Sequence, residues 1–321
     1  MKLVQTLLVR DEVDIVDAQI AYHLNAGVDF VIATDHESRD GTTEILESYA
    51  RDGHLRRIAV SGEMLDGPWR THMARLAATE HGADWVINTD ADEFWISRRG
   101  LLKDVLAAVP EPYGIVFALS RHFVARPDDG AFFAERMTAR VSPSVAINDP
   151  TSPYRPHLKA AHRADPEIEI SFGSHTVFNS RWGAIHHWHP AEVLHFPFRS
   201  LGQWENKGVR RARGDKALGQ YVTALRAAEG GRGADRFRAL AIDDEALECG
   251  RADGSLVVDV RLRDALRALR GNAVEPEPDP PVADPGLISE SVAVRDADLV
   301  RLARFVDGLS ARMADVEARA R

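Results

Sequence analysis

The chain has 321 residues, enough for one large core or for one domain with an appendage. Its hydrophobic content of 45% and charged content of 28% are ordinary for a globular protein. The formal net charge of -9 offers no basic field to collect phosphates, which argues against a nucleic-acid partner. The single cysteine, Cys249, excludes a disulfide framework and a cysteine-based zinc site and fits a reducing compartment.

The hydropathy pattern argues against a membrane span. No stretch of the sequence approaches the ~20 apolar residues that a spanning helix needs. The first apolar run, Leu3 to Val9, contains Gln5, is closed by charged residues and lacks a cleavage site. It therefore predicts a first strand rather than a signal sequence. We expect a soluble, cytoplasmic protein.

Strand and helix patterns alternate from the N-terminus to Ser120. Strands are predicted at 2–9, 28–35, 56–60, 85–90 and 113–120, helices at 15–24 and 70–80, and a turn with a helix at 38–50. Strands separated by helices imply βαβ crossovers. The expected fold is therefore α/β, with a mainly parallel sheet flanked by helices.

The second half has a different organisation. After Arg121 the connections become long and rich in Pro and His, with strand-like pieces at 174–180 and 193–198, and the pattern from 201 to 269 is mostly helical. A Pro- and acid-rich stretch follows. We expect an α/β domain over 1–210 (halves 1–96 and 97–210), a helical extension over 211–272, a linker over 273–287 and an amphipathic helix over 288–321.

The last segment carries an apolar stripe with the spacing of a coiled-coil seam. Its members step by three and four residues: Leu299, Leu302, Val306, Leu309, Met313, Val316 and Ala320. Such a stripe must be covered. The cover is either a second copy, giving a homodimer through residues 299–320, or the chain's own domain, and the pattern does not decide between them.

The most informative stretch is WVINTDADEFW, from Trp85 to Trp95. An apolar run ends in Asp90 and Asp92, at the carboxyl end of a predicted strand, where open α/β sheets bind ligands. Residues at i and i+2 of a strand face the same way, so both carboxylates can bind one divalent cation. A solvated acidic turn is the alternative. Glu93, beside them, is either a supporting group or the first acid of a helix.

Three segments stand in order after the first, second and fourth predicted strands: LLVRDE, ATDHESRDGT and TDADEF. This order and spacing resemble the family 2-like glycosyltransferases of the GT-A fold. The likeness rests on a VRDE tetrapeptide, a D-x-x-S-x-D-G-T turn beginning at Asp35 and a D-x-D-E-F turn beginning at Asp90. It is specific over residues 3–96 and looser to about residue 208. It implies a Rossmann-like GT-A fold and transfer of a sugar from a nucleotide-sugar donor, with a UDP-sugar favoured, to a hydroxyl of a small-molecule or glycan acceptor, with inversion.

The resemblance also implies roles for individual residues. Val9, Arg10 and Asp35 would surround the base and ribose, with Asp35 accepting from a uracil-like N–H. Arg70 would face the nucleotide, with a surface arginine as the alternative. Asp90 and Asp92 would bind Mg²⁺ or Mn²⁺, which bridges the donor diphosphate. The residues after Asp35 in the turn, Asp40 to Thr42, are expected to form a turn and helix cap.

A later signature of the same family resembles HFPFRSLGQWENK, residues 195–207. In that comparison His195 is the third metal ligand, with a structural histidine as the alternative. Arg199 and Lys207 would hold the diphosphate. The roles of the other histidines nearby stay open between the acceptor side and packing: His175, His186, His187 and His189.

An inverting transfer needs a carboxylate that takes the proton of the acceptor hydroxyl. No E-D pair of the ordinary family pattern occurs near mid-chain. Glu135 and either Asp165 or Glu167 are the candidates, and of these Glu135 is placed with Asp92 in the expected catalytic set.

Two other functions are compatible with parts of the sequence. A haloacid-dehalogenase-type phosphatase uses a similar D-x-D, but at its first strand and with a later G-D-x-x-x-D that this chain lacks. A non-catalytic nucleotide-sugar-binding scaffold, assembled through the C-terminal helix, is the second alternative. The presence of both acids beside His195, Arg199 and Lys207 counts against a scaffold.

Overall fold

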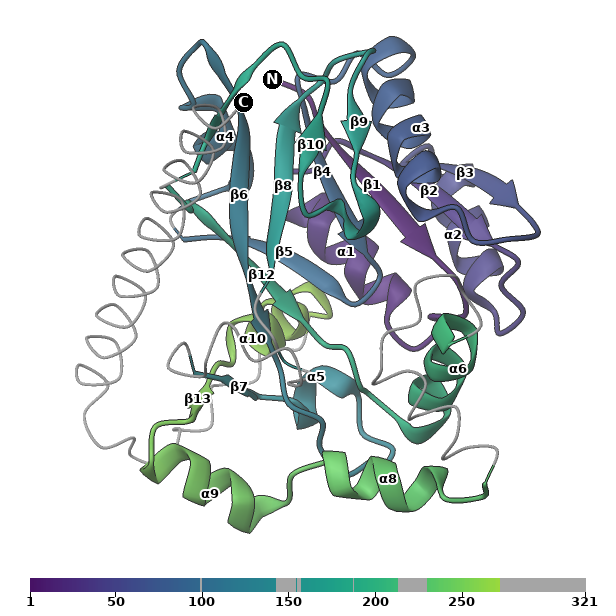
Figure 1. Ribbon diagram of the computed structural model, residues 1–321, viewed down its shortest axis with the longest axis vertical. Coiled ribbons are helices and arrows are strands. Elements are labelled where there is room, and N and C mark those ends of the chain that lie inside the picture. Colours follow the sequence, from purple (N-terminus) through teal and green to yellow (C-terminus); the bar gives the residue numbers. More distant parts are fainter. Residues whose placement is uncertain (99, 143–153, 155–156, 187, 213–229, 272–321) are drawn as a thin grey trace, which may run out of the picture.

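A computed structural model gives the structure of residues 1–98, 100–142, 154, 157–186, 188–212 and 230–271 (Figure 1). The strands are β1 (Leu3–Val9), β2 (Phe30–His36), β3 (Leu55–Val60), β4 (Trp85–Asp90), β5 (Glu93–Ser97), β6 (Tyr113–His122), β7 (Ala139–Val141), β8 (Leu158–Arg163), β9 (Glu169–Ile170), β10 (Val177–Phe178), β11 (Gly183–Ile185), β12 (Ala191–His195) and β13 (Leu256–Val258). The helices are α1 (Val16–Asn25), α2 (Thr42–Arg51), α3 (Asp66–Thr79), α4 (Leu102–Ala107), α5 (Phe133–Arg136), α6 (Leu201–Ala212), α8 (Gly233–Leu240), α9 (Asp244–Ala252) and α10 (Arg261–Leu269), with a 3-10 turn, η1 (Phe172–Ser174).

The main sheet confirms the predicted α/β fold class. In the described part of the chain it has nine strands, in the order β3-β2-β1-β4-β8-β6-β12-β5, with β11 paired to β6. β1 pairs in parallel with β2 and β4, β2 with β3, and β6 with β12. The elements from β1 to β4 and the strand β6 match the predicted series, with ends that differ by a few residues.

Two strands that the sequence patterns did not predict make the sheet mixed. β8 lies between β4 and β6 and is antiparallel to both. β5 follows the acidic turn directly and is antiparallel to β12. Glu93 therefore begins a strand, and its predicted alternative as a helix acid is wrong.

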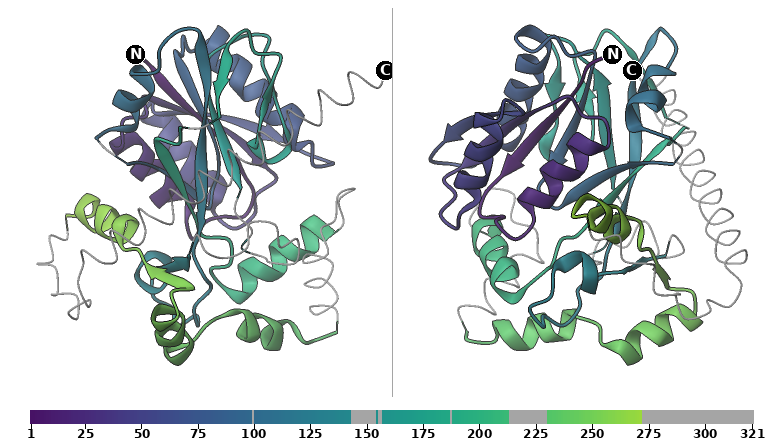
Figure 2. Two further views of the ribbon diagram at one scale, coloured as in Figure 1. Left: turned by 60° about the vertical axis from the view of Figure 1, so that its left-hand side comes forward. Right: turned by 180° about the vertical axis from the view of Figure 1, so that it is seen from behind.

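Helices cover both faces of the parallel half of the sheet. Side chains alternate along β1, so Leu3 and Leu7 pack in one core cluster with α1 and α2. Val4 and Leu8 point to the other face and pack with Met73 of α3. Figure 1 and the view from behind in Figure 2 show α3 and α1 on opposite sides.

A buried polar network fixes the register of β1 against β4. Gln5 Nε2 donates to Thr89 Oγ1 at 2.9 Å, and Thr6 Oγ1 donates to Asn88 Oδ1 at 2.8 Å. All four residues are fully buried. A one-residue slip would leave these groups without partners, at a cost of about 1–3 kcal/mol each. The network therefore holds the end of β4, and with it Asp90, in one position.

His23 is a buried histidine whose tautomer is set by its neighbours. Its Nε2 accepts a hydrogen bond from Trp95 N at 3.0 Å, so the proton must lie on Nδ1, which donates to Gln19 O at 2.8 Å. A second proton on Nε2 would face the Trp95 N–H. Burial accordingly lowers the pKa of His23 to about 4, and burial also lowers the pKa of His162 to about 4.

These two histidines make the free energy of unfolding fall in mild acid. Below about pH 6.5 the unfolded chain binds protons that the folded chain refuses until about pH 4, so stability is lost as the pH falls through that window. Near pH 5 the loss is about 2 kcal/mol for each histidine. Urea denaturation at neutral pH and near pH 5 measures it. His23→Gln should flatten the slope, and equal stability at both pH values would contradict the assignment.

The C-terminal part of the described chain is tied to the domain by packing and by a strand. Leu262 and Leu266 of α10 belong to the same core cluster as α1. β13 pairs with β7, so the extension predicted as helical also contains a strand. α6 runs across the boundary predicted at residue 210. The division of the chain into domains stays a prediction.

The linker over 273–287, the helix over 288–321 and the seam at 299–320 lie outside the described residues. Among the helices that the structure does describe, none combines the length and the apolar character needed to cross a membrane.

Candidate active site

The parallel strands bring most of the predicted residues to one edge of the sheet. Val9 lies in register with Asp35, and Leu8 lies in register with Asp90. On the other side of β8, His195 lies in register with His122. The carboxyl ends of β1, β2, β4, β6 and β12 therefore meet at the same edge, where a ligand crevice is expected.

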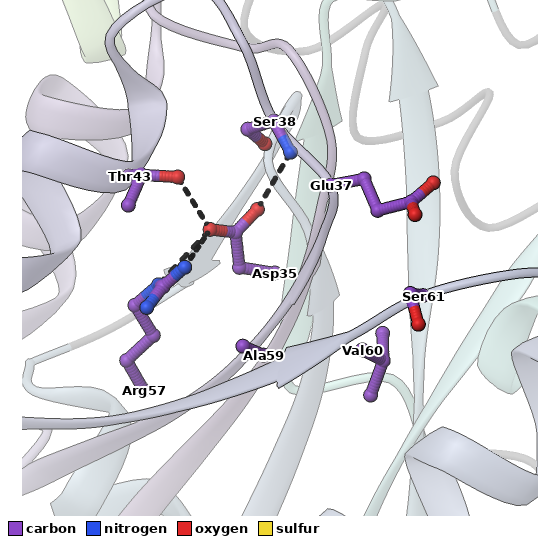
Figure 3. Close-up of a pocket in the computed structure, with 8 residues that line it drawn as sticks. All are labelled: Asp35, Glu37, Ser38, Thr43, Arg57, Ala59, Val60 and Ser61. Atoms are coloured by element: carbon purple, nitrogen blue, oxygen red, sulfur yellow. Dashed lines mark hydrogen bonds and ion pairs between the residues drawn. The ribbon is translucent and has the colours of Figure 1, made fainter.

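A pocket of about 290 Å³ lies beside the ends of β2 and β3 (Figure 3). Eight residues line it: Asp35, Glu37, Ser38, Thr43, Arg57, Ala59, Val60 and Ser61. Within it, Asp35 Oδ2 accepts from Thr43 Oγ1 at 2.6 Å and from Arg57 Nε at 3.0 Å, and Oδ1 accepts from Ser38 N at 3.2 Å. Burial raises the pKa of Asp35, but these hydrogen bonds outweigh it and hold the pKa below its usual value.

The turn after Asp35 has the structural part expected of it. Asp40 Oδ1 accepts from Thr42 N at 3.0 Å and from Thr42 Oγ1 at 2.7 Å. Gly41 has a φ of 107°, which a residue with a side chain rarely adopts. Thr42 Oγ1 in turn accepts from Glu12 N at 2.9 Å and so links this turn to the segment after β1.

Val9 and Arg10 sit where β1 ends. Val9 is buried, and the guanidinium of Arg10 lies 3.4 Å from both ring nitrogens of His36. The His36 ring packs edge-on against Trp69, with 4.8 Å between ring centroids. Side chains alternate along a strand, so Arg10 lies with His36 and Trp69 on the α3 face of the sheet, opposite the side chain of Asp35.

Asp90 and Asp92 do not share a strand face, so that expectation is wrong. β4 ends at Asp90, and Ala91 and Asp92 form the turn into β5. The two carboxylates consequently enter two different groups of charges. The group around Asp92 is called here the Asp92 cluster, and the group around Asp90 the Asp90 cluster.

The Asp92 cluster joins the turn to the segments after β1 and β12. Its members are Glu12, Asp14, Asp92, His195, Arg199 and Lys207. Asp92 Oδ2 is ion-paired with Lys207 Nζ, lies 3.4 Å from His195 Nε2 and lies 4.0 Å from Arg199 Nη1. Arg199 also binds Asp14 at 2.7 Å and pairs with Glu12.

Burial and charge act in opposite directions on the two buried acids of this cluster. Burial raises the pKa of Asp92. Lys207, His195 and Arg199 lower it by more than burial raises it, so the pKa lies well below its usual value. Glu12 is buried as well, and in its case burial outweighs Arg199 and raises the pKa. Asp92 therefore stays a carboxylate over the physiological pH range.

The Asp90 cluster holds the tip of β4 against α3 and β8. Its members are Asp66, Arg70, Asp90, Glu93 and Lys159. Arg70 is 1% exposed, pairs with Asp90 and binds Asp66 Oδ1 at 2.9 Å. Lys159 Nζ lies 3.2 Å from Asp90 Oδ2 and 2.8 Å from Glu93 Oε1.

The residues present fit a divalent cation in part. Asp92 and His195 converge and offer one carboxylate oxygen, the kind of ligand that Mg²⁺ and Mn²⁺ prefer, and one imidazole nitrogen. Asp90 faces Arg70 and Lys159 instead. Within the described residues, no group of three His, Cys, Asp or Glu side chains assembles around one point. The three-ligand set Asp90, Asp92 and His195 is thus not brought together, and the fit is that of a two-ligand site.

His195 also contacts a second histidine. Its Nδ1 lies 2.9 Å from Nδ1 of His122, the last residue of β6. His157 lies edge-on to His122, with 5.6 Å between ring centroids, and His175 lies 5.1 Å from His157. Four imidazoles therefore follow one another along the edge, starting from Asp92.

The other histidines named from the sequence bind the backbone or pack. His175 Nδ1 lies 2.8 Å from Leu158 O, and His189 Nδ1 lies 3.0 Å from Phe117 O. His186 stacks on Phe117, with 5.5 Å between centroids. His187 lies outside the described residues.

The structure gives the candidate bases partners away from Asp92. Glu135 of α5 is ion-paired with Arg267 of α10, at 2.5 Å. Asp165 follows the end of β8, and β8 runs antiparallel to its neighbours, so Asp165 lies at the opposite edge of the sheet. In the described part of the chain no hydrogen bond or ion pair joins Glu135 to either cluster, and its role stays a prediction.

Sequence reasoning missed several members of the two clusters. Glu12 stands within the VRDE tetrapeptide, which was the signal available for it. Asp66 stands four residues before Arg70 on α3, the spacing of a helical ion pair. Lys159 had no such local signal, because its strand was not predicted. The same holds for His122, which contacts His195 of the Asp92 cluster and lies just beyond the end of the predicted strand 113–120.

The family comparison bears on the N-terminal part of the chain. Residues 4–139, less than half of the 321, match the sequence model of glycosyltransferase family 92. The matched segment runs from β1 to the start of β7 and contains both acids of the D-x-D turn. No curated protein matches the chain.

Several solved structures resemble the chain weakly. A crystal structure of S. aureus TarS in complex with UDP is 14% identical, over 86% of this chain and 93% of that one, with a TM-score of 0.34. Glucosyl-3-phosphoglycerate synthase from Mycobacterium tuberculosis, in complex with Mg²⁺ and UDP, is 18% identical over 38% and 43% of the two chains, with a TM-score of 0.25. These values are too low to carry an argument. The family match supports a glycosyltransferase.

Proposed function

We propose that the protein is a metal-dependent glycosyltransferase that transfers a sugar, with inversion, from a nucleotide-sugar donor to a hydroxyl acceptor. The donor we favour is a UDP-sugar. The observation that carries the proposal is the meeting of Asp92, His195 and Lys207 at the carboxyl edge of the parallel strands, the same edge at which Asp35 lines its pocket. The family match over residues 4–139 supports the same class of reaction.

The nucleoside would lie at the ends of β1 and β2. Asp35 is held as a carboxylate, and Oδ1 has a lone pair beyond the one that Ser38 N uses. It can therefore accept from a nucleobase N–H, as expected for uracil. Val9 would contact the ring, and Arg10, above His36, would lie beside the ribose or the first phosphate.

The diphosphate would meet the cations of both clusters. Lys207 and Arg199 are buried, and both contact Asp92, so an incoming phosphate can share them with that carboxylate. Asp90 would contribute to diphosphate binding indirectly, because its ion pair holds Arg70 at the end of β4. A bound Mn²⁺ or Mg²⁺, on Asp92 and His195, would act as a Lewis acid on the diphosphate oxygens.

In the transfer itself the acceptor oxygen forms the new bond to the anomeric carbon while the bond to the nucleotide breaks. Asp92 would act by holding the positive groups that stabilise the departing nucleotide. The acceptor proton passes to a carboxylate, for which Glu135 remains our candidate. When a small-molecule or glycan acceptor binds, Glu135 would either leave Arg267 and accept the proton, or accept it while still paired with Arg267.

The structure favours neither alternative function. A phosphatase would need Asp90 as its nucleophile, whereas both Asp90 oxygens are ion-paired, with Arg70 and with Lys159. For a scaffold, the five ionisable groups gathered around Asp92 would have no task. We keep the cytoplasmic location and the homodimer through residues 299–320 as parts of the proposal, the first because of the single cysteine and the acidic charge.

Calorimetry with UDP and GDP, each with and without Mn²⁺ or Mg²⁺, tests the proposal. UDP should bind more tightly than GDP and more tightly with the metal. Asp35→Ala should weaken UDP binding about 10- to 150-fold, because the loss of one charged acceptor costs about 1.5–3 kcal/mol. Asp29→Ala, which removes a surface acid paired with Lys103, is the matched control. Equal binding of both nucleotides, unaffected by metal, would remove the claim, and a panel of sugar donors would then name the sugar.

A further inference from the structure

The His195 ring uses both of its nitrogens. Nε2 lies 3.4 Å from Asp92 Oδ2, and Nδ1 lies 2.9 Å from His122 Nδ1. His195 ends β12, and its register partner His122 ends β6. The contact between the rings is therefore set by strand pairing rather than by a loop.

The short distance between the two Nδ1 atoms restricts the protons. Two neutral imidazoles that meet through Nδ1 share one hydrogen, which one ring donates and the other accepts. A neutral ring that donates from Nδ1 has a lone pair on Nε2. If His195 is the donor, its Nε2 presents a lone pair toward Asp92. If His122 is the donor, His195 carries its proton on Nε2 and donates it to Asp92.

These two arrangements differ in what they can bind. The first offers a lone pair next to a carboxylate, which is what a divalent cation needs from an imidazole. The second satisfies Asp92 from within the protein, together with Lys207. A change from the second arrangement to the first moves the shared hydrogen from Nδ1 of His122 to Nδ1 of His195, takes a proton from Nε2 of His195 and adds one to Nε2 of His122. The number of protons is unchanged.

We propose that His122 is a positioning residue, which accepts a hydrogen bond from Nδ1 of His195 and thereby directs the His195 lone pair at a divalent cation shared with Asp92. The proposal rests on the proposed function. His122 suits the task because it is 4% exposed and lies against His157, with the rings at 85°. An imidazole held on two sides in this way fixes the orientation of its partner.

Direct Mn²⁺ binding to the full chain, measured by calorimetry without donor, tests the proposal. His122→Ala should weaken the affinity about 10- to 100-fold, the usual cost of losing a partner of a metal-binding histidine. His122→Asn should restore most of it, since the asparagine amide lies close to the Nδ1 position. His122→Gln should restore little, because its amide lies nearer to Nε2. Equal affinities of the Asn and Gln variants would overturn the proposal.

His72→Asn is the control, since it removes an exposed imidazole of α3 that has no part in the contact between His122 and His195. It should bind Mn²⁺ as the wild type does. Nitrogen-15 spectra of the histidines give a readout that does not depend on enzyme activity. For these spectra the diamagnetic Mg²⁺ replaces Mn²⁺. His195 should carry its proton on Nδ1 in the wild type, and this preference should be lost in His122→Ala. If the wild type binds no divalent cation, the metal-dependent function is overturned together with the role of His122. If the wild type binds the cation and both His122→Ala and His122→Asn bind it equally well, only the role of His122 is overturned.

Discussion

Asp92→Asn is expected to lower kcat/KM for the sugar donor by about two to three orders of magnitude, the range seen when one preorganised electrostatic group is removed from a transition state. The substitution keeps the shape of the side chain and removes its charge. Lys207 and Arg199 would lose the carboxylate they share, and His195 would lose the group that makes it part of a cation site.

The measurement combines donor kinetics with calorimetry. The increase in UDP affinity that Mn²⁺ produces should disappear in Asp92→Asn, while binding without metal should persist, because the cations that attract phosphate remain. Asp235→Asn, on the exposed pair with Arg238 of α8, is the control and should leave kcat/KM unchanged. A variant that keeps the metal-dependent gain would remove Asp92 from the centre of the site.

Arg70→Ala is expected to lower the free energy of unfolding by about 3–5 kcal/mol, as the breaking of a buried ion pair does. The guanidinium is 1% exposed and binds Asp66, Asp90 and the Thr89 carbonyl oxygen. Without the guanidinium, Asp66 and Asp90 both lose their arginine partner. Lys159 is then the remaining described cation of the Asp90 cluster.

Urea denaturation of the wild type and the variant gives the value. Arg56→Ala is the matched control, since Arg56 also pairs with an acid, Glu80, but both side chains are largely exposed, 40% and 52%. Its cost should stay below about 1 kcal/mol. A small loss in Arg70→Ala would mean that solvent reaches the Asp90 cluster more freely than its burial indicates.

The elements from β1 to β4 could be predicted because their signals are local. Apolar runs such as Trp85–Ile87 mark buried strands, and Asp40, Gly41 and Thr42 mark the turn before α2 by their own chemistry. The placement of Asp35 and Asp90 at strand ends follows from the same local patterns once the strands are taken as parallel.

The remaining strands depend on partners that are distant in sequence. β8 contains Lys159, His162 and Arg163, a composition that predicts a surface segment. Lys159 is buried there only because Asp90 and Glu93 neutralise it. β6 similarly extends through Arg121, which Glu192 of β12 binds at 2.6 Å. The acidic partners that allow Lys159 and Arg121 to be buried are distant in sequence, so the residues around each of them do not predict the burial.

The predicted arrangement of Asp90 and Asp92 was wrong for the same reason. That Asp90 and Asp92 matter could be read from the turn sequence, but their directions depend on where β4 ends and on the charges that each meets. Asp90 meets Arg70 from α3, and Asp92 meets Lys207 from α6. Both cations were named from the sequence, yet nothing in it assigned one to each acid.

The position of β8 has a consequence for the order in which this chain can fold. Until residues 158–163 have left the ribosome, β4 has no neighbour on that side and exposes a row of unpaired backbone groups, an edge prone to pairing with other chains. Arg70 can already pair with Asp90, whereas Glu93 and the second oxygen of Asp90 gain their ammonium partner only when Lys159 arrives with β8. The span between β4 and β8 is a long loop to close, which slows folding. The nascent N-terminal half therefore carries an open sheet edge until β8 pairs with β4.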